Sequence, residues 1–210
     1  MVARREYTFG TLNREDLNLS PVKQFSSWLD YANEKGISDA TAMALATADK
    51  KGTPTVRIVL LKSFNSKGFV WYSDKRSEKG ESISERPSAE LLFFWKELDR
   101  QVRIRGKIEM VGEEEVRDYF LSRPRESQIA ASISWQSQPI ETRLELERRY
   151  EEFETKHDAD LVLPAHWKGY RLLPSRYEFW QGRKSRLHDR FEYVKSEEVL
   201  DDWDITRLQP

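Results

Sequence analysis

The sequence predicts a mainly β fold with helices (α+β), in which an antiparallel sheet closes into a barrel or folds over on itself. About eight segments have strand patterning, a number that suits such a closed or folded sheet. Most of them are joined by short turns, which favour antiparallel pairing. No GxGxxG or GxxxxGK[ST] motif is present, which argues against a parallel nucleotide-binding fold.

The first half of the chain predicts one helix followed by five strands. Ser20 is a suitable N-cap with Pro21 at the first helical position, apolar residues recur on one face as far as Ala32, and Gly36 ends the helix. Alternating or continuous apolar runs bounded by turn residues then predict the strands. These are Ala42–Ala48, Thr55–Phe64, Gly68–Ser73, Ala89–Trp95 and Gln101–Val111, with a short helix from about Ser77 to Glu85.

The second half predicts helices first and strands afterwards. Helical periodicity begins at Glu113, is interrupted by Pro124, and returns in a charged segment from Glu141 to Lys156. Strand patterns follow at Gly169–Leu173, Glu178–Gln181, Arg186–Val194 and Trp203–Leu208. We therefore expect a mobile, polar N-terminal arm over residues 1–18 and a single domain over residues 19–210, with helical insertions at about 113–157.

Composition excludes several classes of function. The 35 Lys and Arg residues balance 36 Asp and Glu residues, so the net charge of -1 predicts neither a nucleic-acid partner nor an anionic membrane surface. The chain has no cysteine, and its three histidines lack metal-site spacing, so no metal is expected. Without a signal-like or membrane-spanning apolar run, the sequence predicts a cytoplasmic protein.

The most informative short segment holds Arg186, His188 and Arg190 at alternating positions. If this segment is a strand, the three side chains project from one face. Like charges in such a row need an anion, a carboxylate partner or access to water. A phosphorylated ligand and an exposed basic edge neutralised by Asp189 are equally compatible with this segment taken alone.

Three further patterns have residue types suited to anion binding. Arg57 and Lys62 bracket an apolar strand, and their odd spacing predicts that they lie on opposite faces and grip different groups, unless both simply extend into solvent. Gln101 begins a basic strand, where an amide can recognise the edge of a heterocycle. Tyr119, Arg123 and Ser127 are spaced by four around Pro124, where a new helix N-terminus presents free N–H groups.

Taken together, six ordered motifs resemble the pyridoxine (pyridoxamine) 5′-phosphate oxidase family. The resemblance covers nearly the whole chain, and the order and intervals of the motifs make it more specific than any motif alone. The motifs are Arg57–Lys62, Arg100–Arg103, Tyr119–Ile129, Glu178–Gly182, Arg186–Arg190 and Arg207–Pro210.

This resemblance implies a homodimeric FMN-binding split β-barrel with flavin sites at the subunit interface. The implied reaction oxidises pyridoxamine 5′-phosphate or pyridoxine 5′-phosphate to pyridoxal 5′-phosphate, with O2 as electron acceptor and H2O2 as product. The implied FMN contacts are Arg57, Ile58, Val59, Leu60, Lys62, Tyr72, Ser73, Lys79, Gln101, Gln136, Ser137, Trp180 and Arg190. The implied substrate contacts are Lys62, Tyr119, Arg123, Ser127, Arg186, His188, Arg4 and Tyr7, with Arg186 and His188 at the reacting ring.

The chain departs from the family pattern near the expected cofactor phosphate. Glu78 stands in Ser77-Glu78-Lys79 where the family usually has an arginine, and Arg76 is a candidate to replace the missing cation. Trp135 occupies a position where a smaller or basic residue is expected. We therefore expect these departures to affect FMN affinity more than substrate binding.

Two other functions are compatible with parts of this pattern. A split-barrel carrier or sensor would bind flavin or pyridoxal phosphate without turnover. A nucleic-acid-binding β-barrel would use Arg103, Arg105 and exposed aromatic residues, and would bind single strands in a salt-sensitive manner.

Overall fold

The structure is a computed structural model that describes residues 5–157, 161–196 and 202–210. Its strands are β1 (Ala42–Ala48), β2 (Pro54–Leu60), β3 (Ser63–Asn65), β4 (Gly68–Asp74), β5 (Ser88–Trp95), β6 (Arg100–Met110), β7 (Trp167–Gln181), β8 (Asp189–Lys195) and β9 (Trp203–Leu208). Its α-helices are α1 (Pro21–Glu34), α2 (Glu78–Glu85), α3 (Glu113–Ser122), α4 (Arg125–Ile133) and α5 (Arg143–Lys156). Short 3-10 turns lie at η1 (Arg14–Asp16), η2 (Lys96–Leu98) and η3 (Lys184–Arg186).

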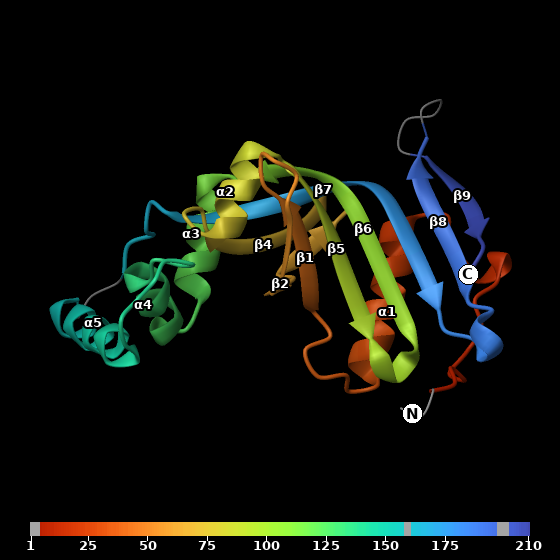
Figure 1. The fold of residues 1–210 in the computed structure, drawn as a ribbon, viewed down its shortest axis with the longest axis horizontal. Coiled ribbons are helices and arrows are strands. Elements are labelled where there is room, and N and C mark those ends of the chain that lie inside the picture. Colours follow the sequence, from red (N-terminus) through yellow and green to blue (C-terminus); the bar gives the residue numbers. More distant parts are fainter. Residues whose placement is uncertain (1–4, 158–160, 197–201) are drawn as a thin grey trace.

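The described strands form one antiparallel sheet of nine strands, which confirms the predicted α+β class. Its order is β2-β1-β5-β6-β7-β4-β3, and β8 joins β7 and β9. β7 pairs with β6 along one edge and, along the other, first with β4 through residues 167–172 and then with β8 through residues 176–181. The sheet curls around this long strand (Figure 1).

A β-bulge between Arg105 and Gly106 interrupts the β6 ladder where β7 carries Pro174. A Cβ atom at Gly106 would lie 2.0 Å from the Leu173 carbonyl oxygen, so the two backbones can approach here because position 106 has no side chain. The bulge increases local bending and twist, which helps the sheet to curl.

Two apolar clusters hold the sheet and helices together. In the larger one, Phe25 of α1 packs edge-on against Phe69 and Phe93, so α1 covers the inner face of the sheet. In the smaller one, Phe120 of α3 and Ile129 of α4 pack with Trp167. This second cluster fixes the three-helix region beside β4 and the start of β7, on the left in Figure 1.

The structure corrects several of the predicted strand boundaries. The run at 55–64 is divided into β2 and β3, and the two short strands predicted at 169–173 and 178–181 are parts of the continuous β7. The strand predicted at 186–194 begins at Asp189, because residues 184–186 form η3 with Ser185 and Arg186 in left-handed conformations, at φ values of 57° and 64°. Arg186 therefore lies outside the strand, and the predicted row of three cations on one strand face does not form.

The described part of the predicted arm, residues 5–18, packs on the sheet. Leu12 and Leu17 are buried in the larger apolar cluster, and the Leu12 N–H donates to Asp189. Among the described residues, no helix is long and apolar enough to cross a membrane, and no group of His, Asp or Glu side chains is arranged to hold a metal ion.

Candidate functional site

A cavity of about 840 Å³ lies between β2, the end of β4, the start of α2, and α3 and α4. Its size is typical of sites for small organic ligands. The residues of the implied FMN set that line it are Arg57, Ile58, Val59, Leu60, Lys62, Tyr72, Ser73, Lys79, Gln136 and Ser137. The residues of the implied substrate set that line it are Lys62, Tyr119, Arg123 and Ser127. We call this space the α2–α4 cavity.

Lys79 supplies a buried positive charge at the α2 side of the cavity. Ser77 caps α2 by accepting from the Gly80 N–H at 3.3 Å, and this turn directs Lys79 inward, where it is 8% exposed. Its Nζ donates to Gln136 Oε1 at 2.6 Å and to Ser73 Oγ at 3.1 Å. Burial and the nearby Arg57 charge lower the pKa of Lys79 to about 8, although Asp74 and Glu78 act in the opposite direction. A bound anion would stabilise the protonated amine.

Arg57 is held beside Lys79 by strand neighbours. Its Nη1 donates to Thr47 Oγ1 at 2.8 Å and its Nη2 to Thr55 Oγ1 at 2.5 Å. Nη2 also lies 3.8 Å from Glu78 Oε2, at the exposed mouth of the cavity. Burial lowers the pKa of Arg57, and the Glu78 charge opposes that shift. Glu78 thus supplies a carboxylate within a site rich in cations.

The structure corrects two expectations about these cations. Arg57 and Lys62 line the same cavity rather than opposite faces, because β2 ends at Leu60 and Lys62 follows the strand instead of continuing its alternation. Arg76 does not replace the missing cation: its Nη2 bonds Asp74 Oδ2 and the Ser134 carbonyl oxygen, each at 2.7 Å, and its guanidinium lies over Trp135.

A second positive group lies at the α3–α4 side of the cavity. Within the described residues, Arg123 Nη1 is buried and has no hydrogen-bond partner. Because buried charged donors are normally paired, this N–H group is a candidate to bind an anionic ligand. Burial lowers the pKa of Arg123. Ser127, in the first turn of α4, and Lys62 line the cavity with it.

Aromatic rings form one wall of the same space. Tyr72 stacks on Tyr119 with ring centroids 4.1 Å apart and on Trp167 at 5.1 Å, and the guanidinium of Arg123 lies 4.9 Å from the Trp167 ring. Trp167 was not among the site residues expected from the sequence, because it lies outside the six motifs that carry the family resemblance. Flat rings beside two cation groups suit a planar, phosphorylated ligand.

The other expected site residues gather far from this cavity. Tyr7 lies edge-on to Trp180 and His188, with ring centroids 5.4 Å and 5.3 Å apart, and the guanidinium of Arg186 lies 5.3 Å from the Tyr7 ring. We call these four residues the Tyr7 cluster. Arg4, which was expected beside Tyr7, lies outside the described residues.

His188 has a defined hydrogen-bonding state in this cluster. Its Nδ1 accepts from the Arg183 backbone N–H at 3.1 Å, so a neutral ring carries its hydrogen on Nε2. Burial lowers the pKa of His188, and the charges of Arg186 and Arg190 lower it further against the opposing effect of Asp189. The ring is therefore suited to donate from Nε2 while neutral.

Gln101 and Arg190 lie on either side of Trp180 in the sheet. Gln101 pairs with Trp180 across β6 and β7, and Trp180 pairs with Arg190 across β7 and β8. Arg190 Nε donates to Glu178 Oε1 at 2.9 Å and its Nη1 to the Gln209 carbonyl oxygen at 2.8 Å. Gln101 and Arg190 therefore extend the Tyr7 cluster and do not line the α2–α4 cavity.

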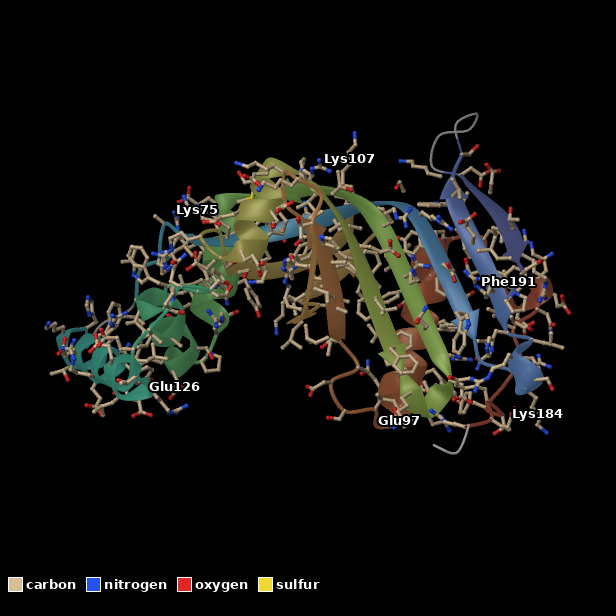
Figure 2. All side chains as sticks on the ribbon, in the orientation of Figure 1. Lys75, Glu97, Lys107, Glu126, Lys184 and Phe191 are labelled. Carbon is tan, nitrogen blue, oxygen red and sulfur yellow. The ribbon has the colours of Figure 1, made fainter. Side chains whose placement is uncertain are left out.

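One chain therefore carries two separate groups of site residues. Tyr72, in the cavity, pairs with Gly169 near the start of β7, while Trp180 lies eleven residues further along the same strand, or about 35 Å of extended chain. Figure 2 shows the same separation, with Glu126 of α4 and Lys184 of η3 at opposite ends of the molecule.

Comparisons with known proteins agree with this geometry. Residues 29–157 match the family model described as pyridoxamine 5′-phosphate oxidase, and residues 167–210 match the pyridoxine 5′-phosphate oxidase C-terminal dimerisation region. The chain belongs to the pyridoxamine 5′-phosphate oxidase family. A relative from Hydrogenovibrio crunogenus, named pyridoxine/pyridoxamine 5′-phosphate oxidase 1, is 52% identical, with 99% of this chain and 96% of that protein covered.

Further relatives extend this family relationship. A pyridoxine/pyridoxamine 5′-phosphate oxidase from Crocosphaera subtropica is 47% identical, with 99% of this chain and 97% of that protein covered. Among solved structures, PhzG from Burkholderia lata, in complex with tetrahydrophenazine-1-carboxylic acid, has a TM-score of 0.87 at 30% identity and covers 93% of this chain and 95% of its own. The antiparallel, curled sheet is thus the fold shared within this family.

Proposed function

We propose that the protein is a cytoplasmic, FMN-dependent oxidase that converts pyridoxamine 5′-phosphate or pyridoxine 5′-phosphate to pyridoxal 5′-phosphate, with O2 as electron acceptor and H2O2 as product. The observation that carries this proposal is the pairing of two cation groups in one cavity. Lys79 with Arg57 supports one phosphate site, and Arg123 with Lys62 supports a second. A phosphorylated cofactor and a phosphorylated substrate need two such sites side by side.

The residues present fit a flavin phosphate on chemical grounds. Lys79 and Arg57 supply positive charge, Ser73, Gln136 and Ser137 supply polar groups, and the buried, unpartnered Arg123 Nη1 suits the substrate phosphate. When bound, FMN supplies a two-electron acceptor that O2 can reoxidise. The chain itself binds and orients both phosphates, and Arg186 and His188 are proposed to orient the substrate ring and hold a proton at His188 Nε2.

We further propose a homodimer in which the partner copy completes each site. The sheet face opposite α1 carries Val56, Ile58, Leu60 and Phe94 as exposed apolar side chains, a pattern typical of an interface. Strand register places the members of one row side by side on this outer face: Ile58, Ala44, Leu92 and Arg103. Phe94, Gln101, Trp180 and Arg190 form the next row. A second copy on this face would bring its Gln101 and Trp180 to the α2–α4 cavity of the first copy, whose own Gln101 and Trp180 do not line it.

The charge pairing on the sheet opposes a nucleic-acid-binding function. Arg103 pairs with Glu90 at 2.5 Å and with Glu178 at 3.2 Å, and Arg105 pairs with Glu90 at 2.8 Å. These carboxylates neutralise the two arginines that such a function would use.

Peroxide production under air tests the proposed reaction directly. We expect purified protein with added FMN to form H2O2 from pyridoxamine 5′-phosphate and pyridoxine 5′-phosphate, and to do so poorly with unphosphorylated pyridoxamine. Flavin binding without peroxide formation from either phosphorylated vitamer would instead support a carrier or sensor.

FMN affinity should fall as the pH rises from 7 to 9. With a pKa of about 8, Lys79 is mainly charged at pH 7 and mainly neutral at pH 9, whereas the phosphate is already doubly ionised across this range. Phosphate binding therefore takes up a proton in this range, and a loss of affinity of about tenfold is expected for one charge-assisted contact. Fluorescence titration measures the Kd for FMN at each pH. Riboflavin, which has no phosphate, is the control ligand. The Lys79→Gln variant should bind FMN weakly and without this slope; a slope that persists in it would assign the titration to another group.

Replacing Glu78 with glutamine should tighten FMN binding. The substitution removes a carboxylate 3.8 Å from Arg57 while keeping the size of the side chain. Relief of repulsion toward a phosphate at an exposed cavity mouth is expected to lower Kd by about three- to tenfold. Riboflavin binding should stay the same in Glu78→Gln. Equal tightening of both ligands would mean that Glu78 acts on the cavity wall rather than on phosphate.

A further inference from the structure

Asp99 is a buried carboxylate at the tight turn between β5 and β6, and the site described so far does not use it. It follows η2, has a left-handed backbone with φ of 51°, and is 3% exposed. Aspartate tolerates this conformation better than most residues, but a buried carboxylate must be satisfied by donors to be stable. The donors at Asp99 come from the N-terminal segment.

The side chain of Asp99 binds residues 5–9 at three points. Its Oδ1 accepts from Arg5 Nη2 at 2.6 Å, and its Oδ2 accepts from the backbone N–H groups of Thr8 at 3.1 Å and Phe9 at 3.3 Å. Arg5 also donates to the Lys96 carbonyl oxygen at 2.8 Å. Hydrogen bonds to a charged acceptor are the stronger kind, so this carboxylate is a principal anchor of the segment.

The backbone of Asp99 binds a second segment, the end of β7. Its carbonyl oxygen accepts from the Gly182 N–H at 2.7 Å and from Gln181 Nε2 at 3.2 Å. One residue thus connects the N-terminal segment to the strand end that carries Trp180. The neighbouring Lys96 and Leu98 carbonyl oxygens accept further bonds from Arg5 and Gln181, so the whole β5–β6 turn joins these two partners through Asp99 and its neighbours.

Tyr7 lies between the two partners that Asp99 connects. A Cβ atom at Gly182 would come within 2.7 Å of the Tyr7 ring, so this contact depends on position 182 having no side chain. The guanidinium of Arg5 lies 5.6 Å from the Tyr7 ring centroid, and that of Arg186 lies 5.3 Å from it. The position of Tyr7 therefore depends on Asp99 in two ways. The Asp99 side chain binds the residues around Tyr7 in sequence, and the Asp99 backbone binds Gly182, which contacts the Tyr7 ring.

We propose that Asp99 is a positioning residue that fixes residues 5–9 so that Tyr7 completes the substrate-facing wall formed with Trp180, Arg186 and His188. This inference rests on the proposed function for the identity of the substrate. Because Asp99 acts through Tyr7 and does not touch the reacting atoms, its loss weakens substrate binding more than it slows turnover.

The test compares Asp99→Gly with a matched control, Asp39→Gly. Glycine suits the left-handed backbone at both positions, where φ is 51°, so each variant removes a carboxylate without adding strain. Asp39 is exposed and lies in the turn before β1. For Asp99→Gly we expect KM for pyridoxamine 5′-phosphate to rise about tenfold, with kcat within about twofold and flavin content unchanged. Asp39→Gly should match the parent protein.

Two further variants separate positioning from general stabilisation. Tyr7→Ala should raise KM to a similar extent, and the double variant Asp99→Gly/Tyr7→Ala should be no worse than either single variant, because both remove the same contact. Asp99→Asn keeps an acceptor for the Thr8 and Phe9 N–H groups and should recover part of the affinity, and it provides the same test if Asp99→Gly fails to fold.

Limited proteolysis gives a readout that does not depend on activity. Trypsin should cleave after Arg5 and Arg14 faster in Asp99→Gly than in the parent or in Asp39→Gly. Unchanged KM and cleavage, or additive effects of Asp99→Gly and Tyr7→Ala, would overturn the inference. Absence of peroxide from the parent protein would instead contradict the proposed function, while the cleavage rates would still report whether Asp99 holds the segment.

Discussion

Replacing Val56 with aspartate is expected to convert the proposed dimer to a monomer and to remove both flavin binding and oxidase activity. Val56 is 69% exposed on the outer face of edge strand β2, opposite Ala46 of β1, and it does not line the α2–α4 cavity. An unpaired charge buried by a partner there costs about 3 kcal/mol or more, which weakens association at least about a hundredfold. Light scattering after gel filtration measures the mass, and flavin absorbance and peroxide formation report the sites.

A second valine provides a matched control for this substitution. Val162 is 84% exposed, follows the helical region, and does not belong to the outer face. Val162→Asp should leave mass, flavin content and activity unchanged. If Val56→Asp remains dimeric and active, the outer face is not the interface, and the exposed apolar row needs another explanation.

The sequence predicts most reliably those elements whose signals are local. The helix Pro21–Glu34 is confirmed because a proline in the first turn, an apolar stripe and a glycine just past the end lie within one segment, although the Ser20 side chain makes no capping hydrogen bond. The strand Ala42–Ala48 is confirmed: it pairs with β2 and β5, and every second residue is buried, with Met43 and Leu45 in the larger apolar cluster. Here local propensity and tertiary packing favour the same structure.

The predictions that are wrong depend on contacts distant in sequence. Alternation at Arg186, His188 and Arg190 resembles a strand, but the neighbouring Ser185 N–H donates to Glu6 Oε2 at 3.3 Å, and Arg186 lies over Tyr7. Contacts with the N-terminal segment accompany the left-handed backbone at positions 185 and 186. No periodicity in residues 184–190 could reveal a partner almost 180 residues away.

The site shows the same division between local motif and distant partner. Motif spacing nominates Lys62 and Arg123, and the family resemblance adds Lys79; all three line one cavity. Spacing alone does not reveal that Trp180 and Arg186 lie elsewhere in the same chain. Asp99 has no motif signal at all, because its role arises from donors about 90 residues earlier in the chain.

Mixing two inactive variants should restore activity if each site is built from two protomers. Arg123→Ala removes a buried phosphate donor from the cavity and is expected to lower kcat/KM by about a hundredfold. Arg186→Leu removes a cation from the Tyr7 cluster and is expected to lower turnover by a similar factor through lost substrate orientation, with little loss of flavin.

A mixed dimer of these variants contains one site in which neither substituted position is used, because each protomer contributes its unchanged half. Its cavity comes from the Arg186→Leu chain and its Tyr7 cluster from the Arg123→Ala chain, whereas the second site carries both changes. Random reassociation after joint denaturation and refolding makes half of the dimers mixed, so the mixture should reach about a quarter of the parent activity. Each variant refolded alone is the control. Activity that stays at the level of the single variants would mean that the α2–α4 cavity and the Tyr7 cluster do not meet across an interface, because sites contained within one protomer cannot complement each other.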